Sequence, residues 1–480
     1  MEKRQLCSTE ETRSRRTAAE TGAASSKLTG AFERFQQAVP EQQVEQMLQG
    51  RAAFSRQGPF RAWVVIWLMI FQRLHAKGTL SVAVRELLTG PVQAFVRRPE
   101  GTAGEPLSGN TSAYSQARSK LPLEVAEQVS DWIFESMWEQ PKALPGLGRP
   151  MFLLDGSSLL LPHTQDLVQA YPPPRNQHGA SHWPVMRVLV AHDVVSGLAV
   201  RPCWGPMDGE AAVSEQGLAK EIMSRLPADC VALGDRNFGV FSMAYHATQQ
   251  KHPCLFRLTK LRATKLAGGV APSAGTDRPT RWVASRWDRS SNPELPEQAS
   301  VEGRLLAFKV RDAAGKWQKL YFFTTLAVPA EQILSLYGYR WNIETDLRSL
   351  KKEVRLHMLE AQSPAMVAKE LVLGVAAYNL TRAAMNEAAW ALQLHPRQFS
   401  FSQAQDTLNA FLPLFAKATS NEERQQIMQR MLRVFAQSTL PHRRKRRSAP
   451  RMIWPRPCSF PKRKVAKQAK QGKVAKKGVA

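Results

Sequence analysis

Residues 230–239, which read CVALGDRNFG, decide the fold of this chain. The apolar run from Cys230 to Leu233 is long enough for one short buried strand, and Asp235 follows it closely. A second apolar run, Met151 to Leu154, leads in the same way into Asp155. The sequence therefore predicts two strands that each deliver an aspartate just past a strand end, where side chains from neighbouring strands of one sheet meet.

The pattern around these two strands predicts their neighbours. Apolar and β-branched runs bounded by turn residues predict strands, and amphipathic spacing predicts helices between them. In chain order we predict strands at 151–154, 185–191 and 198–203, a helix at 214–226, a strand at 230–233, a helix at 241–250 and a strand at 254–259. This order, β-β-β-α-β-α-β with three antiparallel strands first, predicts an α/β fold with an RNase H-like core, a mixed five-stranded sheet with helices.

The remaining sequence is predicted to be mostly helical. Turns rich in Gly, Pro and Ser at about 260–318 predict a β-rich insertion, after which a strand at 319–326 and helices at 329–354 and 363–389 continue the core. The predicted regions are a flexible leader at 1–27, an all-helical DNA-binding domain at 28–145, the catalytic domain at 146–390, a helical region at 391–440 and a disordered basic tail at 441–480.

The composition indicates a polyanionic partner. The 480 residues carry 66 Lys and Arg against 40 Asp and Glu, a formal net charge of +26, and the segment after Pro441 holds fifteen of these cations and no acid. We expect nucleic acid ahead of an anionic membrane surface. The longest apolar run, Ala62 to Phe71, is too short to span a bilayer, and we find no secretory signal. Five cysteines without a CxxC pair favour a reducing cytoplasm.

The predicted helix at 329–354 carries a polar stripe beside its apolar face. With Tyr337 at zero and about 100° per residue, Arg340, Glu344 and Lys351 fall at about 300°, 340° and 320°. Leucine and isoleucine occupy the adjoining sector, so the stripe borders the face that packs on the core. A surface ladder of ion pairs would give the same pattern. The two aspartates at strand ends favour a site wall instead.

Asp155, Asp235 and Glu344 are therefore the candidate catalytic and metal-binding residues. Their oxygens suit two Mg²⁺ ions, with Mn²⁺ as a substitute, because these ions keep coordination sites for water and substrate phosphate. Such a pair activates a water or a 3′-hydroxyl and stabilises the leaving oxygen, so no protein nucleophile is needed. The chain contains no Gly-x-Ser-x-Gly, Walker or His-Glu-x-x-His motif. His192 and Asp193 lack a third partner, which predicts a structural role for them.

The spacing Tyr337-x2-Arg340-x3-Glu344-x6-Lys351 resembles the YREK signature of the DDE transposases of insertion sequence family four. The segments 154–157 and 233–239 resemble the two aspartate motifs of that family, and the resemblance extends over about 112–385. It implies DNA transposition: hydrolytic cleavage at terminal inverted repeats, with or without a hairpin intermediate, and strand transfer into target DNA by the freed 3′-hydroxyl. It also implies double-stranded DNA as partner, a homodimer in the synaptic complex and a location on the bacterial nucleoid.

The same resemblance implies roles for residues around the triad. Tyr337, Arg340 and Lys351 would grip phosphates beside the scissile bond, and Arg236 belongs to the second aspartate motif as a further candidate DNA contact. One tryptophan of the insertion would stack a flipped base, although each candidate also suits a core position. The three candidates are Trp282, Trp287 and Trp317.

Arg118 and Lys120, beside a turn at Pro122, are candidate phosphate contacts, and a solvated helix end fits them equally well. Three other functions fit parts of the sequence. They are a domesticated or inactive RNase H-like DNA-binding protein, a junction nuclease or resolvase, and a structural RNA- or chromatin-binding protein. The basic tail alone favours the last of these, whereas the complete triad and polar stripe favour a transposase.

Overall fold

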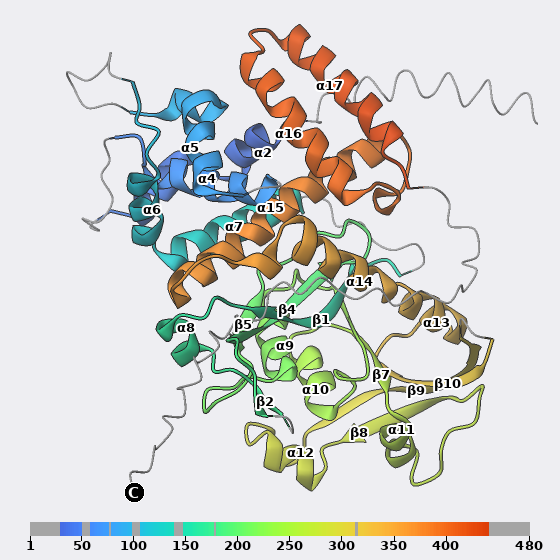
Figure 1. Ribbon diagram of the computed structural model, residues 1–480. Coiled ribbons are helices and arrows are strands. Elements are labelled where there is room, and N and C mark those ends of the chain that lie inside the picture. The colour runs from blue at the N-terminus through green and yellow to red at the C-terminus, as the bar shows by residue number, and fades with distance from the viewer. Residues whose placement is uncertain are drawn as a thin grey trace, which may run out of the picture.

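The structure is a computed structural model, and it describes residues 29–49, 58–75, 78–97, 106–138, 147–176, 179–312 and 315–440 (Figure 1). A group of helices forms the upper half of the molecule in this view, and a mixed β-sheet with its own covering helices forms the lower half. The predicted leader and the predicted basic tail lie outside the described residues.

One eight-stranded sheet organises the lower half. Its strands, in spatial order, are β5 (Cys203–Pro206), β4 (Val185–Asp193), β1 (Met151–Leu160), β6 (Val231–Gly234), β7 (Cys254–Leu258), β10 (Trp317–Thr324), β9 (Ser300–Arg311) and β8 (Asp277–Val283). β1, β6 and β7 are mutually parallel, and the other neighbouring pairs are antiparallel. With α9 (Glu215–Met223) before β6 and α10 (Phe241–Gln249) before β7, the predicted order β-β-β-α-β-α-β is confirmed.

The predicted five-stranded sheet is too small. β10, which corresponds to the strand predicted at 319–326, pairs with the edge of β7, and β9 and β8 of the expected insertion continue the main sheet beyond it. This pairing satisfies backbone groups that β7 would otherwise expose at a sheet edge. The third strand also differs from the prediction: a turn with Gly197 at φ 75° follows β4, and the strand begins only at Cys203.

The smaller elements of this half follow the main strands. α8 (Gln165–Ala170) and the short strands β2 (Arg175–Asn176) and β3 (Gly179–Ala180) lie between β1 and β4. α11 (Lys260–Leu266) and α12 (Arg286–Ser291) belong to the segment that contains β8.

Side chains of the central strands alternate between two covering layers, as the strand period of two requires. Leu154 of β1 and Ala232 of β6 belong to a core shared with α9 and α10. Leu153 and Leu233 belong to the opposite core, which they share with α13 (Ala330–Gly338) and α14 (Trp341–Arg348). The residues at odd positions of β1 and β6 therefore face α13 and α14.

The upper half is one helical layer around α15 (Pro364–Ala391). α15 packs against α4, α7 and α16, and a single hydrophobic core extends from Phe35 to Phe435. None of the helices in the described ranges combines the length and apolar character that a bilayer crossing requires. Besides α15, the upper half contains α2 (Ala31–Ala38), α3 (Glu41–Met47), α4 (Ala62–Leu74), α5 (Leu80–Thr89), η1 (Pro91–Phe95), α6 (Thr111–Lys120), α7 (Leu123–Met137), η4 (Pro396–Gln398), α16 (Phe401–Lys417) and α17 (Asn421–Gln437).

The single helix predicted at 329–354 is wrong. The chain forms α13 and α14 with a break at Tyr339 and Arg340, then the π-helical turn η2 (Ser349–Glu353) and the 3₁₀ turn η3 (Leu356–Met358). At the break, the Arg340 N–H donates to the Tyr337 carbonyl at 3.0 Å, three residues back instead of four. Because the pitch changes here and again at η2, a uniform helical wheel does not describe how the polar stripe is presented.

Candidate active site

Asp155 and Asp235 lie on neighbouring parallel strands. Leu153 of β1 pairs with Leu233 of β6, so the two aspartates, each two residues further along, stand at the same level. Each stands two residues after a leucine that faces α13 and α14, so both aspartates face that layer. The prediction that Asp155 follows a strand end is wrong, because β1 continues to Leu160 by pairing with β4. Asp235 does follow the end of β6.

The surroundings of Asp155 disfavour its ionised form. Burial is the largest cause and raises the pKa of Asp155 to about 6, although the Gly156 N–H donates to its carboxylate at 2.9 Å and acts to lower it. The negative charges of Asp235 and Glu215 raise the pKa further, and the positive charge of Arg340 opposes them. A divalent cation would relieve this crowding of carboxylates, and hard oxygen donors are the ligands that Mg²⁺ prefers. The donor set therefore fits the metal that the sequence predicts.

Glu344 lies on α14, in the layer that the two aspartates face. Its side chain is 53% exposed, and its carboxylate lies 3.6 Å from the Arg340 guanidinium. Arg340 in turn is close enough to Asp155 to influence its pKa. Within the described ranges, no three side chains of Asp, Glu, His or Cys stand close enough together to hold a metal ion. The structure thus places Glu344 on the helix that packs against β1, with its carboxylate turned towards Arg340.

Lys351 and Tyr337 also border the aspartates. The Lys351 Nζ donates to Ser157 Oγ at 2.9 Å, two residues beyond Asp155 on β1. Burial lowers the pKa of this lysine. Tyr337 is buried against Phe322, with ring centroids 4.7 Å apart, and its hydroxyl has no hydrogen-bond partner among the described residues. Burial raises its pKa, and a nearby arginine, Arg257, opposes the shift. The structure therefore places Tyr337, Arg340 and Lys351 near β1 and β6, and Glu344 is connected to them through its ion pair with Arg340.

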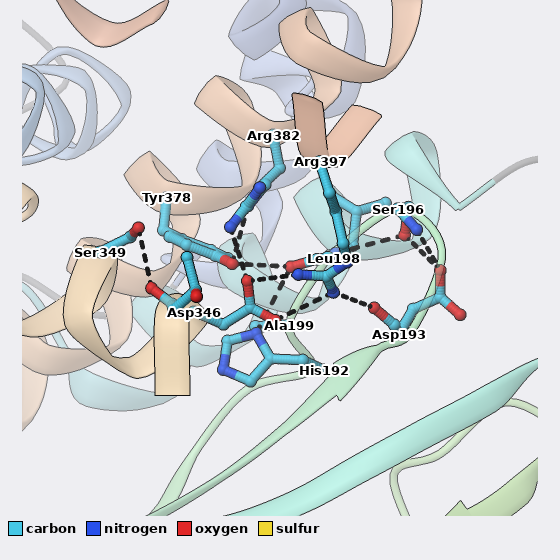
Figure 2. A network of polar contacts seen from close by, with 12 residues as sticks. His192, Asp193, Ser196, Leu198, Ala199, Asp346, Ser349, Tyr378, Arg382 and Arg397 are labelled. Carbon is cyan, nitrogen blue, oxygen red and sulfur yellow. Dashed lines mark hydrogen bonds and ion pairs between the residues drawn. The ribbon is translucent and has the colours of Figure 1, made fainter. Parts of the chain in front are cut away.

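A buried network anchors α14 to the helical layer (Figure 2). Asp346, two residues after Glu344, is fully buried and accepts hydrogen bonds from Arg382 of α15 at 2.6 Å and from Arg397 of η4 at 2.8 and 3.0 Å. Burial acts to raise the pKa of Asp346, but the charges of the two arginines outweigh it and hold the pKa below its usual range. Arg397 also donates to the Asp193 carbonyl at the end of β4 at 3.1 Å. The network therefore ties the helix that carries Glu344 to the strand beside β1.

His192 and Asp193 lie next to this network and are themselves buried. Burial lowers the pKa of His192 to about 4, so its ring is neutral at physiological pH. The Asp193 carboxylate accepts hydrogen bonds from the Ser196 N–H and hydroxyl, both at 2.6 Å, within the turn after β4. Figure 2 shows both residues on the β4 side of Asp346. These contacts shape the turn, and in the register of β1 and β4 the two residues stand opposite Leu153 and Phe152, two and three positions before Asp155.

Glu215 is a residue of this site that sequence reasoning missed. It occupies the first turn of α9, after the N-cap Ser214, and the Asn237 side-chain amide donates to its carboxylate. Gly156 makes room for it, because a Cβ at that position would lie 2.5 Å from Glu215 Cδ. An acid in the first turn of a helix is common. Only the packing of α9 against β4 and β5, which brings the Glu215 side chain to Gly156, shows that this acid approaches Asp155.

The three insertion tryptophans occupy different surroundings. Trp282 packs against Phe241 and Phe323 in the core. Trp317 is 51% exposed on β10. Trp287 of α12 is 72% exposed and lines a cavity of about 330 Å³, which Gln216 and Lys220 of α9 also line. Among the three, Trp287 therefore lines a cavity that borders α9, the helix that carries Glu215.

The remaining predicted DNA contacts are Arg118, Lys120 and Arg236, and Arg236 alone adjoins one of the aspartates in sequence. Arg118 is buried, and its guanidinium pairs with Glu370 of α15, so its contacts are structural. This differs from the expected surface phosphate contact, because α6 packs this face onto α15. Lys120, at the end of α6, is exposed. Arg236, directly after Asp235, is also exposed, and its carbonyl accepts a hydrogen bond from Arg262 at 2.8 Å.

Comparison with known proteins gives two matches that cover this site. The family described as "Transposase DDE domain" matches residues 146–380. The chain is also similar to "Transposase InsG for insertion sequence element IS4" of Escherichia coli (strain K12), with 24% identity over 359 residues, 73% of this chain and 78% of the relative. The family match begins just before β1 and ends within α15, so it contains both aspartates and Glu344.

Proposed function

This chain belongs to the DDE transposase family, and on that premise we propose how its residues carry out DNA transposition. The protein is a transposase, a metal-dependent enzyme that cuts DNA and transfers the cut strand. We propose that its core is RNase H-like. The strand order supports this: five strands lie side by side as β5-β4-β1-β6-β7. Of these, β1, β6 and β7 are parallel, and β4 and β5 are antiparallel to their neighbours. β10, β9 and β8 extend this five-stranded unit.

The observation that carries the proposal is the pair of aspartates at one level of the sheet, facing the helix that bears Glu344. We assign Asp155, Asp235 and Glu344 as the residues that hold two Mg²⁺ ions, with Mn²⁺ as a substitute. When bound, such ions activate the attacking water or 3′-hydroxyl and stabilise the leaving oxygen. Glu344 must leave Arg340 in order to join the aspartates, which frees the guanidinium for the substrate.

The neighbouring side chains are suited to hold the scissile phosphate. Arg340, once free of Glu344, offers the planar fork that matches phosphate oxygens, and Lys351 offers a point charge beside β1. The Tyr337 hydroxyl, buried without a partner among the described residues, is available to donate to the same group. A buried polar atom usually has a partner, so this one supports a ligand at this position.

We further propose that Trp287 stacks a base that leaves the duplex. It is the one of the three candidates that is both exposed and next to a cavity beside α9. Glu215, on the same helix and near Asp155, would add a fourth carboxylate to the metal surroundings. Lys120 and Arg236, both exposed, remain proposed contacts to the DNA backbone.

The proposed partners follow from this chemistry. Double-stranded DNA, as terminal inverted repeats and as target, is the substrate, and a homodimer in the synaptic complex would bring two ends together. Because that substrate is chromosomal, we propose that the protein acts on the nucleoid. The net charge of +26 supports association with such a polyanion.

The proposal is tested by cleavage of duplexes that carry the terminal repeats of the element, with Mg²⁺ present, by Asp155→Asn, Asp235→Asn and Glu344→Gln. Each substitution should abolish cleavage and leave DNA binding measurable, because it removes a metal ligand and no phosphate contact. Asp166→Asn, an exposed acid on α8, is the matched control and should cut normally. Normal cleavage by any of the three variants would remove that residue from the site.

One observation favours a second candidate function, a DNA-binding protein that no longer cuts: no carboxylate cluster is assembled around a metal position in the described part of the chain. The same assay separates the two. An inactive protein would bind terminal DNA without cleavage in wild type and variants alike. A junction nuclease would cut branched DNA with no preference for the terminal repeats.

A further inference from the structure

The hairpin formed by β9 and β10 projects beyond the edge of the sheet where the aspartates lie. Asp235 is level with Arg257 of β7, because Gly234 pairs with Phe256, and Arg257 pairs with Phe322 of β10. Lys319 and Trp317 lie three and five residues before Phe322. At about 3.4 Å per residue they reach roughly 10 and 17 Å past the level of the aspartates. The start of β10 therefore overhangs the substrate side of the sheet, two strands away from Asp235.

This overhang presents cations on one face. Lys309 pairs with Lys319 and Arg311 pairs with Trp317 across the hairpin, and residues two apart on a strand share a face. The Trp317 ring lies 4.7 Å from the Lys309 Nζ and 4.6 Å from the Arg311 Cζ. All four side chains are exposed. We call Lys309, Arg311, Trp317 and Lys319 the hairpin strip.

The arrangement is unfavourable for the isolated protein. Like charges directly opposite each other in an antiparallel pair destabilise it, and Lys309 faces Lys319. Across the described ranges, none of the three cations pairs with an acid. The aromatic ring between two of them holds their charged groups at fixed positions. Fixed and unneutralised cations beside a phosphodiester-cleaving site match the backbone of a nucleic acid.

We propose that the hairpin strip is a binding surface for the phosphate backbone of the duplex held in the active site. This inference rests on the function proposed above. Successive phosphates of one strand are about 3.4 Å apart along the helix axis, so the strip would meet phosphates about three to five nucleotides from the scissile bond. Cations without a base-edge partner give affinity and register, and they do not select sequence.

The first test measures the salt dependence of binding by the full chain to a duplex of random sequence. The combined variant Lys309→Gln, Arg311→Gln, Lys319→Gln should make the slope of log K against log salt shallower by about 2 to 3, because each neutralised phosphate contributes about 0.9. The matched control replaces three exposed cations of α16 and α17, Lys417, Arg430 and Arg433, by Gln, and its slope should equal that of wild type. Equal slopes for the strip variant and wild type would overturn the proposal.

Two further measurements separate binding from folding. Without DNA at low salt, the strip variant should melt no lower than wild type, because like-charge repulsion has been removed; a lower melting temperature would show a structural role and overturn the proposal. Trp317→Phe should reduce the fluorescence change on DNA binding, whereas Trp390→Phe, at a similarly exposed position on α15, should not. No difference between these two would also count against the strip.

A phosphate-replacement experiment locates the contact. Methylphosphonates three to five nucleotides from the cut should weaken DNA binding by wild type and leave binding by the strip variant unaffected. The uncharged linkage and the strip substitutions each remove the same contact between a cation and a phosphate, so the second change has no further effect. Equal weakening of both proteins would overturn the assignment. Normal cleavage by Asp155→Asn together with an intact strip effect would overturn the triad and leave the strip standing. Loss of that cleavage together with no strip effect would overturn the strip and leave the triad standing.

Discussion

Replacing Asp346 by alanine should destabilise the protein strongly, because it would leave two arginines buried without their counter-charge. Asp346 is fully buried, and the side chains of Arg382 and Arg397 are 3% and 13% exposed. Removing one partner of a buried ion pair costs about 3–5 kcal/mol. Some hydrogen bonds survive the change, because Arg382 still donates to the Tyr378 hydroxyl at 2.8 Å. We therefore expect a loss of about 4 kcal/mol, near the middle of that range.

The free energy of unfolding is measured by urea denaturation at pH 7, with the slope m compared between variants to confirm that the same transition is observed. Asp346→Asn should lose less than Asp346→Ala, because the amide oxygen still accepts one hydrogen bond. The control is Glu294→Ala, which breaks an ion pair between Lys220 and a carboxylate that is 58% exposed. A pair of that kind contributes about 1 kcal/mol or less.

A loss for Asp346→Ala no larger than that of the control would refute the reasoning. It would mean that the two arginines are satisfied without Asp346, and that this network does not anchor α14. Loss of stability together with normal Mg²⁺-dependent cleavage at low temperature would show that the network stabilises the fold without positioning Glu344.

Two further predictions concern a buried acid and a close contact. Burial raises the pKa of Glu86 to about 7, and the hydrogen bond that the Trp67 indole donates to it at 3.1 Å acts in the opposite direction. Because the folded-state pKa is the higher one, the stability that protonation of Glu86 provides is complete below pH 4.5 and is lost as the pH rises through 7. Between pH 5 and 8 wild type should therefore lose about 2–3 kcal/mol relative to Glu86→Gln in urea unfolding, and parallel pH profiles would contradict this. Gly156→Ala should displace the Glu215 carboxylate and weaken Mn²⁺ binding measured by electron paramagnetic resonance, because the added Cβ would lie 2.5 Å from Glu215 Cδ. Gly217→Ala, whose Cβ would meet only Ser214 Oγ at 3.4 Å, is the control, and equal Mn²⁺ affinity of the two variants would exclude Glu215 from the site.

The sequence alone predicted the parts of the fold that depend on local pattern. The order of strands and helices from β1 to β7 is confirmed, because short apolar runs and amphipathic spacing are properties of neighbouring residues. The family could also be predicted from the sequence, because the spacing from Tyr337 to Lys351 that indicates it is a local pattern. Asp155 and Asp235 could be chosen as candidates because each follows or interrupts an apolar strand.

Features that depend on contacts between distant segments could not be predicted. The predicted insertion extends the main sheet because β10 meets β7, and nothing within either strand specifies that pairing. Arg118 suited a surface contact in sequence, but its partner Glu370 lies 252 residues away. Glu215 is an ordinary acid in a first helical turn until α9 packs beside Gly156.

The segment that bears Glu344 shows most clearly which features the sequence determines and which depend on the tertiary structure. Its sequence determined that Tyr337, Arg340, Glu344 and Lys351 belong together, because their spacing is helical. Only the tertiary structure decided how they are presented, since the break at Arg340 and the π-helical turn that contains Lys351 change the pitch between them. The physical reason is that the helix must satisfy packing on the sheet and the buried arginines around Asp346 at once, and those partners come from other parts of the chain.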